Sequence, residues 1–263
     1  MAALSSAFYY ALCFLMGASV FSFLNVVAYR VERGLPFVKG RSLCPACGHV
    51  LGPADLIPVL GFLLLRGRCR YCGGRLSRRE PLVEALGGLL LIACLVAFGG
   101  RLAGFPVANL GALAAFALLS VLALVALVDG DTLEIPNGFI LALLVPALLC
   151  AWAFPGTGLW ARGAGALCAS LPMLVLALCI PGAFGGGDIK LMAVLGFALG
   201  WRLTLLTLLL AVFTGGGYAI YLLLAKKKKR GEQLAFGPFL CLGAALSLFF
   251  GEGLIAWYMG FFS

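Results

Sequence analysis

The sequence predicts an all-α polytopic membrane protein with about eight transmembrane helices and one long polar loop between the first and the second. Hydrophobic residues make up 63% of the 263 residues. The mean hydropathy is +1.11, far above the range of soluble globular domains. Apolar runs of about 20 residues, the length that crosses the hydrocarbon core, recur along the chain. A soluble globular fold is therefore excluded.

The apolar runs define eight candidate spans. The first run has no Lys or Arg before Arg30, so it lacks the charged start of a cleaved signal peptide and is interpreted as a retained span. The sixth run is short for a full crossing. The predicted spans are residues 6–29, 82–100, 106–128, 136–154, 160–181, 188–200, 203–225 and 236–262.

The basic residues predict the orientation. Loop 30–81 carries ten of the 19 Lys and Arg residues, and Lys226–Arg230 form a second basic run. Cytoplasmic loops hold the excess of Lys and Arg, so both segments are expected in the cytoplasm and the N-terminus outside. If the short sixth span did not cross the membrane, the basic run Lys226–Arg230 would lie on the side opposite to the cytoplasm. Arg101, Arg162 and Arg202 are then left for the outer face.

This pattern predicts three parts of the chain. Residues 1–29 form the first transmembrane helix, residues 30–81 form the cytoplasmic loop, and residues 82–263 form the main membrane core. No linker separates a second hydrophobic domain, and no internal repeat is evident. The sequence indicates neither an oligomeric state nor a nucleic-acid partner.

Two CxxC pairs in the polar loop predict a metal site. They read CPACGH (44–49) and CRYCGG (69–74), and a glycine follows each pair. Four thiolates make a closed tetrahedral zinc site, although the 21-residue gap exceeds the usual range by about one residue. A cytoplasmic location keeps thiols reduced and disfavours disulfides. A structural zinc that organises the loop is expected, with His49 as a bystander. The predicted ligands are Cys44, Cys47, Cys69 and Cys72.

Two aspartates stand out among only ten acidic residues. Asp129 ends the apolar run LLSVLALVALVD (118–129), and Asp188 follows three glycines in AFGGGDIKLM (183–192). Carboxylates at membrane depth are costly, so they are functional hypotheses by default. The predicted topology puts both at the cytoplasmic membrane surface. The sequence therefore suggests a carboxylate pair.

Such a pair has a definite chemistry. Two close carboxylates do not both ionise near neutral pH. The ionised partner takes a proton from water while the protonated one polarises a peptide carbonyl, as in aspartic proteases. Glycines beside Asp188 permit unusual backbone angles and close approach of an extended peptide. The alternative is a glycine-rich interfacial turn in which Asp188 caps the sixth span.

Six motifs together resemble a known family. In order they are GASVFSFLNVVAYRVERG (17–34), the two CxxC pairs, DLIPVLGFLLLRGRCRYCGGRLSRREPLVE (55–84), VDGDTLEIPN (128–137), GGGDIKLM (185–192) and AFGPFL (235–240). Over nearly the whole chain the sequence is similar to the type IV prepilin peptidases, also called leader peptidases with N-methyltransferase activity. These belong to the GxGD intramembrane aspartyl proteases.

The resemblance implies a substrate and a second activity. The family cleaves the short basic leader of prepilins and pseudopilins after a glycine, on the cytoplasmic side of the bacterial inner membrane. Members with the cysteine-bearing loop also methylate the new N-terminal amine with S-adenosylmethionine. The membrane is a further expected partner, with Lys226–Arg230 at anionic lipid headgroups.

The resemblance also implies which residues act. Asp129, seven residues before Pro136, matches the first catalytic aspartate, and Asp188 matches the aspartate of GxGD. Gly185 and Gly187 are then the glycines of that motif. Asp131 is a less favoured alternative to Asp129.

The methyl-transfer region fits the family less closely. Glu80 stands where the family usually has an aromatic residue, and no S-adenosylmethionine site can be carried over. Asn25 is interpreted as an interhelical hydrogen bonder or as part of that site. Two other readings remain open: a prepilin peptidase without methyl transfer, and an ion-coupled transporter whose carboxylates carry ions or protons.

Overall fold

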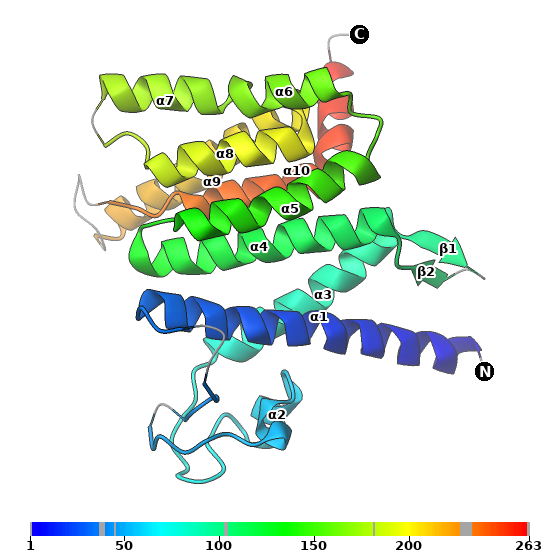
Figure 1. Cartoon of the computed structure of the whole chain (residues 1–263), viewed down its shortest axis with the longest axis vertical. Coiled ribbons are helices and arrows are strands. Elements are labelled where there is room, and N and C mark those ends of the chain that lie inside the picture. The colour runs from blue at the N-terminus through cyan, green and yellow to red at the C-terminus, as the bar shows by residue number, and fades with distance from the viewer. Residues whose placement is uncertain are drawn as a thin grey trace. The chain divides into compact units, whose positions relative to one another are not determined.

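The computed structural model describes residues 2–36, 40–44, 46–102, 105–180, 182–226 and 233–261, and their regular structure is almost entirely helical (Figure 1). The chain divides into two compact units, residues 1–116 and 117–263. In chain order the elements are α1 (Ala2–Glu32), η1 (Pro53–Leu56), α2 (Leu60–Leu64), α3 (Arg79–Phe98), β1 (Gly100–Leu102), β2 (Phe105–Val107), α4 (Leu110–Thr132), α5 (Asn137–Ala153), α6 (Leu159–Cys168), α7 (Ser170–Cys179), α8 (Gly186–Leu199), α9 (Trp201–Leu224) and α10 (Gly237–Met259).

Helices occupy all eight predicted spans. Within the described residues, six segments are long and apolar enough to cross a membrane: α1, α3, α4, α6 together with α7, α9 and α10. The other two, α5 and α8, are shorter, with 17 and 14 residues. The prediction of an all-α polytopic membrane protein is confirmed. The sides of the membrane stay a prediction, and the basic residues 227–230 lie outside the described part of the chain.

The third span differs from its predicted bounds. An antiparallel hairpin pairs Gly100 with Val107, in a region assigned partly to spans, and α4 begins only at Leu110. Asn109 explains this start, because its Oδ1 accepts the N–H of Ala112 at 2.8 Å and so caps the first turn. At its other end α4 continues to Thr132. Asp129 therefore lies inside the last turn of α4 and not beyond it.

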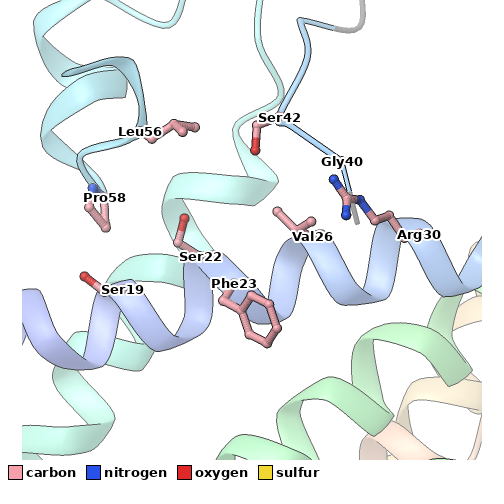
Figure 2. A pocket seen from close by; sticks show the side chains of 9 residues that line it. All are labelled: Ser19, Ser22, Phe23, Val26, Arg30, Gly40, Ser42, Leu56 and Pro58. Carbon is pink, nitrogen blue, oxygen red and sulfur yellow. The ribbon is translucent and has the colours of Figure 1, made fainter. Parts of the chain in front are cut away.

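In the first unit, α1 packs closely along α3. A Cβ atom on Gly17 would collide with the backbone oxygen of Gly87, so small residues let the two backbones approach. Asn25 Nδ2 donates to the backbone oxygen of Glu80 at 3.2 Å, which confirms the interhelical hydrogen bond. The loop between these helices carries the cysteines, and a pocket lies between it and α1 (Figure 2).

In the second unit, α8 is the central helix. It contacts α5, α6, α7, α9 and α10, and more than half of its residues are buried. Gly196 approaches Gly165 of α6 so closely that neither position accommodates a Cβ atom. Neighbouring helices thus surround α8, which is too short to cross a membrane by itself. Polar backbone groups at membrane depth are tolerated where they are buried in protein in this way.

Arg162 is buried, which the sequence analysis did not anticipate. It was assigned to the outer face, which stays a prediction, and it belongs to α6 and is only 1% exposed. Its guanidinium donates to the backbone oxygens of Phe154 at 2.7 Å and Ala198 at 2.6 Å, at the ends of α5 and α8. Helix C-termini leave carbonyls without intrahelical partners, and a cation there is favourable. Arg162 therefore joins two helix ends.

Candidate active site and metal centre

Asp129 is anchored to the start of α10. Its side chain is 4% exposed, and its Oδ2 accepts the N–H of Gly237 at 2.9 Å. This N–H is one of the groups that a helix N-terminus leaves unpaired, and the helix dipole favours a carboxylate there. A Cβ on Gly237 would lie 2.6 Å from the same oxygen. Only glycine fits this position.

Asp188 is anchored in a similar way at the start of α8. It is 8% exposed, and its Oδ2 accepts the N–H of Gly185 at 3.3 Å. Gly185 is the N-cap residue and Asp188 lies three residues later, so the alternative in which Asp188 is the cap is wrong. Its Oδ1 is buried and has no hydrogen-bond partner among the described residues. A buried polar atom without a partner is costly. Capping the helix therefore explains the position of Oδ2 but not the burial of Oδ1.

The structure brings the two aspartates together. Their carboxyl groups are close enough to interact electrostatically. The two anchoring glycines each follow a phenylalanine, and the rings of Phe184 and Phe236 have centroids 5.6 Å apart. Asp131, in contrast, is exposed. Asp129 is thus the acid of this segment that pairs with Asp188.

Two neighbours of the pair had no role in the sequence analysis. Gly237 lies in the AFGPFL motif, where the Gly-Pro step at the start of the last apolar run was the available signal. Lys190 Nζ donates to Asn137 Oδ1 at 2.9 Å and thereby ties α8 to α5. Gly187 is fixed by packing, because a Cβ there would lie 2.8 Å from that of Ile135.

The four loop cysteines form one cluster. Their sulfur atoms all lie within 4.8 Å of one another, and the Sγ atoms of Cys44 and Cys72 are 3.9 Å apart. Tetrahedral zinc with Zn–S bonds of about 2.3 Å requires sulfurs about 3.8 Å apart, so the donor set fits this metal. The two knuckles are alike: Gly48 and Gly73 have φ of 70° and 69°. Their N–H groups donate to the backbone oxygens of Cys44 and Cys69.

Backbone donors prepare the cluster for a cation. The N–H groups of Cys47 and Ala46 lower the pKa of Cys44 to about 7. The N–H of Gly74 lowers the pKa of Cys72, but hydrogen bonding to the other thiols and burial outweigh it and raise this pKa to about 11. The Cys44 thiol therefore ionises more readily than a free thiol and the Cys72 thiol less readily, and a bound cation would favour the thiolate of Cys72.

A polar pair supports the second knuckle. Asp55 Oδ1 forms an ion pair with Arg70 Nε at 2.7 Å, and the hydroxyl of Tyr71 donates to Asp55 Oδ2 at 3.3 Å. The His49 ring lies against Tyr71, with centroids 3.7 Å apart. His49 is not part of the cysteine cluster, in agreement with its interpretation as a bystander.

The fold and the two sites define a polytopic helical membrane protein that combines two buried aspartates with a four-cysteine cluster whose geometry fits a metal ion. Residues 15–98 match the bacterial peptidase A24 N-terminal domain, and residues 116–220 match the type IV leader peptidase family. The chain belongs to the type IV leader peptidase family, as its motifs predicted, and is therefore a peptidase. This membership argues against a transporter.

Relatives cover most of the chain. The prepilin leader peptidase/N-methyltransferase of Bacillus subtilis (strain 168) is 33% identical over 247 residues, which are 94% of this chain and 96% of the relative. The protein of the same name from Burkholderia pseudomallei (strain K96243) is 32% identical over 95% of this chain and 88% of its own. The protein of the same name from Myxococcus xanthus (strain DK1622) is 40% identical over 81% of this chain and 62% of the relative. No solved structure matches the chain.

Proposed function

We propose that this protein removes the basic leader of type IV prepilins and pseudopilins with Asp129 and Asp188, and then methylates the new N-terminal amine. The observation that carries the proposal is the paired anchoring. Each aspartate uses one oxygen to accept a glycine N–H at a helix start, and the other oxygen of Asp188 is buried without a partner. The printed names of the relatives supply the substrate class and the second activity.

The cleavage step follows from two coupled carboxyl groups. A close pair holds one proton between them near neutral pH. The ionised carboxylate takes a proton from water, and the water oxygen attacks the scissile carbonyl carbon while the protonated carboxyl gives its proton to the carbonyl oxygen. The C–N bond then breaks, and the proton taken from water passes to the leaving amine, while a hydroxyl of the tetrahedral intermediate returns its proton to the other carboxylate. No covalent enzyme intermediate is required.

The proposed location follows from the charge pattern. The protein spans the bacterial inner membrane several times, with the N-terminus outside and the aspartates at the cytoplasmic face. A prepilin has a basic leader followed by an apolar helix in the membrane. Its scissile bond then lies at the depth of the aspartate pair.

The cysteine cluster is proposed to hold a structural zinc. Four thiolates leave no open coordination position, so the metal shapes the loop and takes no part in the chemistry. S-adenosylmethionine, when bound, supplies the methyl group. The chain's own residues would hold it beside the new amine, which would release one proton to water.

The test is a prepilin-processing assay on purified protein, with mass spectrometry of the product. We expect Asp129→Asn and Asp188→Asn each to lower the cleavage rate by roughly a thousandfold or more. The matched control is Asp131→Asn, an exposed acid in the same turn, which retains cleavage. Cleavage that survives Asp129→Asn would contradict the proposed catalytic pair of Asp129 and Asp188. A wild-type product without the added methyl group would mean that the protein is a peptidase without methyltransferase activity.

A further inference from the structure

A pocket of about 350 Å³ lies in the first unit between α1 and the polar loop. This volume is in the range of small-molecule sites. Figure 2 shows side chains from the C-terminal half of α1 on one side and loop residues on the other. The residues that carry the argument are Ser19, Ser22, Phe23 and Arg30 of α1 with Ser42 and Pro58 of the loop.

The pocket explains a polar stripe on an otherwise apolar helix. Ser19, Ser22 and Arg30 follow the three- and four-residue spacing of one helix face, and all three line the pocket. Ala18 and Phe21, on another face, are completely buried. Polar residues in a membrane span face protein or a water-filled cavity. The stripe therefore indicates an aqueous pocket and not a packed interface.

Several polar groups in the pocket are available to a ligand. The hydroxyls of Ser22 and Ser42 have no hydrogen-bond partner in the described part of the chain. Ser19 donates to the backbone oxygen of Leu15 at 2.7 Å, which leaves its own oxygen free to accept. These hydroxyls offer both donors and acceptors along one wall.

Arg30 marks one end of the pocket. Its Nη1 donates to the backbone oxygen of Pro36 at 3.4 Å, and a Cβ on Gly40 would lie 3.2 Å from Nη2. Gly40 has a φ of 116°, which favours glycine, so the loop backbone passes directly against the guanidinium. The pocket thus has a cationic end and a hydroxyl-lined wall.

A strained turn holds the opposite edge. Val59, next to Pro58, has a φ of 61°, which is a rare and costly conformation for a β-branched residue. Its N–H donates to Glu84 Oε2 of α3 at 2.8 Å. Strain of this kind persists where the surrounding structure fixes it and often marks functional sites. Glu84 therefore positions the pocket edge.

We propose that this pocket binds S-adenosylmethionine, an inference that rests on the proposed methyl transfer. Arg30 pairs with the carboxylate of the methionine group, as guanidinium groups do, and Ser22 and Ser42 bind the ribose hydroxyls. The exposed ring of Phe23 offers a surface for the adenine. The pocket lies within the segment that matches the N-terminal domain, apart from the peptidase segment with both aspartates.

A second pocket in the same loop is less suitable. It has about 330 Å³ and is lined by Phe62 and by Arg66, Arg68, Arg75 and Arg78. Arg68 and Arg75 lie opposite each other in a β-bridge, where like charges are destabilising. Four guanidinium groups repel the sulfonium cation of S-adenosylmethionine. This arginine pocket fits a purely anionic group instead.

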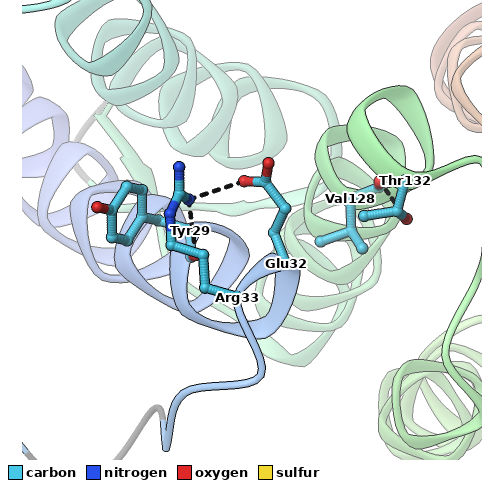
Figure 3. Close-up of polar contacts among 5 residues, drawn as sticks. All are labelled: Tyr29, Glu32, Arg33, Val128 and Thr132. Atoms are coloured by element: carbon cyan, nitrogen blue, oxygen red, sulfur yellow. Dashed lines mark hydrogen bonds and ion pairs between the residues drawn. The ribbon is translucent and has the colours of Figure 1, made fainter.

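The experiment is equilibrium binding of radiolabelled S-adenosylmethionine to the purified full chain. We expect Arg30→Gln to weaken binding roughly tenfold to a hundredfold, because a charge-assisted hydrogen bond is lost. Ser22→Leu fills the pocket and weakens binding comparably. The matched control is Arg33→Gln. Arg33 pairs with Glu32 at 3.0 Å and lies over the Tyr29 ring (Figure 3), and it does not line the pocket. A second control, Arg75→Gln, tests the arginine pocket.

Prepilin cleavage and methylation are measured on the same samples. Wild-type cleavage rates show that the second unit of each variant is folded, and resistance of the loop to limited proteolysis shows that the first unit is folded as well. Binding that is unchanged in Arg30→Gln and Ser22→Leu, or lost in Arg75→Gln, would overturn the assignment while leaving methyl transfer intact. A wild-type protein that neither binds the donor nor methylates its product would instead contradict the proposed methyl transfer itself.

Discussion

The aspartate pair and the cysteine cluster are held together by different means. Asp129 and its anchor Gly237 are 108 residues apart in the chain, and their hydrogen bond exists only because the helices of the second unit pack. In the described loop residues 40–44 and 46–78, the only buried residues are Cys44, Gly61 and Cys69. The aspartate site is thus organised by a helical core. The cysteine site has almost no core, and the proposed zinc would supply its stability.

Among changes that leave both aspartates in place, the largest expected effect tests the anchoring of Asp129. Gly237→Ala places a Cβ where Asp129 Oδ2 lies, so the carboxylate must move. We expect cleavage to fall about a hundredfold, the scale of a displacement of about 1 Å in an active site. Alanine favours helix more than glycine does, so the loss does not come from weakened helix propensity. The measurement is the prepilin cleavage rate.

The control for this variant is Gly253→Ala in the same helix. A Cβ there meets nothing within 4 Å, and wild-type cleavage is expected. Equal rates for Gly237→Ala and Gly253→Ala would show that the Asp129 anchor is dispensable.

Removal of the metal tests the other half of the comparison. Cys47→Ser is expected to reduce bound zinc from about one per chain to nearly none, because three thiolates hold the ion less tightly. The loop should then become sensitive to limited proteolysis, and methylation of the product should fall more than about tenfold. The helices of the second unit have their own core, so prepilin cleavage should largely persist.

The matched control is Cys179→Ser, an exposed cysteine outside the cluster. It should keep zinc, methylation and cleavage. If metal loss from Cys47→Ser abolished cleavage and lowered the melting temperature of the whole chain, the two sites would not be independent.

Arg162 provides a test of how the helices of the second unit are held together. Arg162→Gln removes the charge that joins the ends of α5 and α8 and leaves buried carbonyls without donors. We expect a loss of roughly 2–4 kcal/mol in stability, visible as a lower melting temperature with zinc retained. Arg202→Gln, at an exposed position in α9, should change little. Equal melting temperatures for the two variants would mean that Arg162 is not structural.

Sequence reasoning succeeded where the signal is local or periodic. Apolar runs located eight helical spans, one of which contains both α6 and α7, and the CxxC spacing identified four cysteines whose sulfur atoms do converge. The predicted catalytic pair of Asp129 and Asp188 stays a prediction, although both side chains are buried and each accepts a glycine N–H at a helix start. Sequence reasoning gave the wrong start for the third span, because Asn109 caps α4. It also missed a hairpin, which occupies residues assigned to the second and third spans.

The anchors were missed for a different reason. The backbone N–H of Gly237 bonds to the Asp129 carboxylate, 108 residues away. Arg162 bonds to the backbone oxygens of Phe154 and Ala198, 8 and 36 residues away, and none of these contacts leaves a periodic trace. An arginine near a span end looks the same in sequence whether it faces water or caps a buried helix. Only the packed arrangement of α5, α6 and α8 decides between them.

The smallest expected effect concerns the ion pair beside the second cysteine knuckle. Burial opposes ionisation of Asp55, but the N–H of Gly52, the charge of Arg70 and the Tyr71 hydroxyl outweigh it and hold its pKa below the ordinary value of 3.8. A lowered pKa means that the stabilising contribution is complete above that value and is lost only as the pH falls toward the folded-state pKa.

Asp55→Asn should therefore weaken zinc retention by a constant factor, roughly twofold to fivefold for a half-exposed pair, between about pH 5 and 8. The measurement is the rate of zinc transfer to a chromogenic chelator at several pH values. Glu32→Gln, which breaks an exposed pair on α1, serves as the control. A factor that changed steeply across this range would mean that Asp55 titrates there, and the loop would then depend on a proton as well as on its metal.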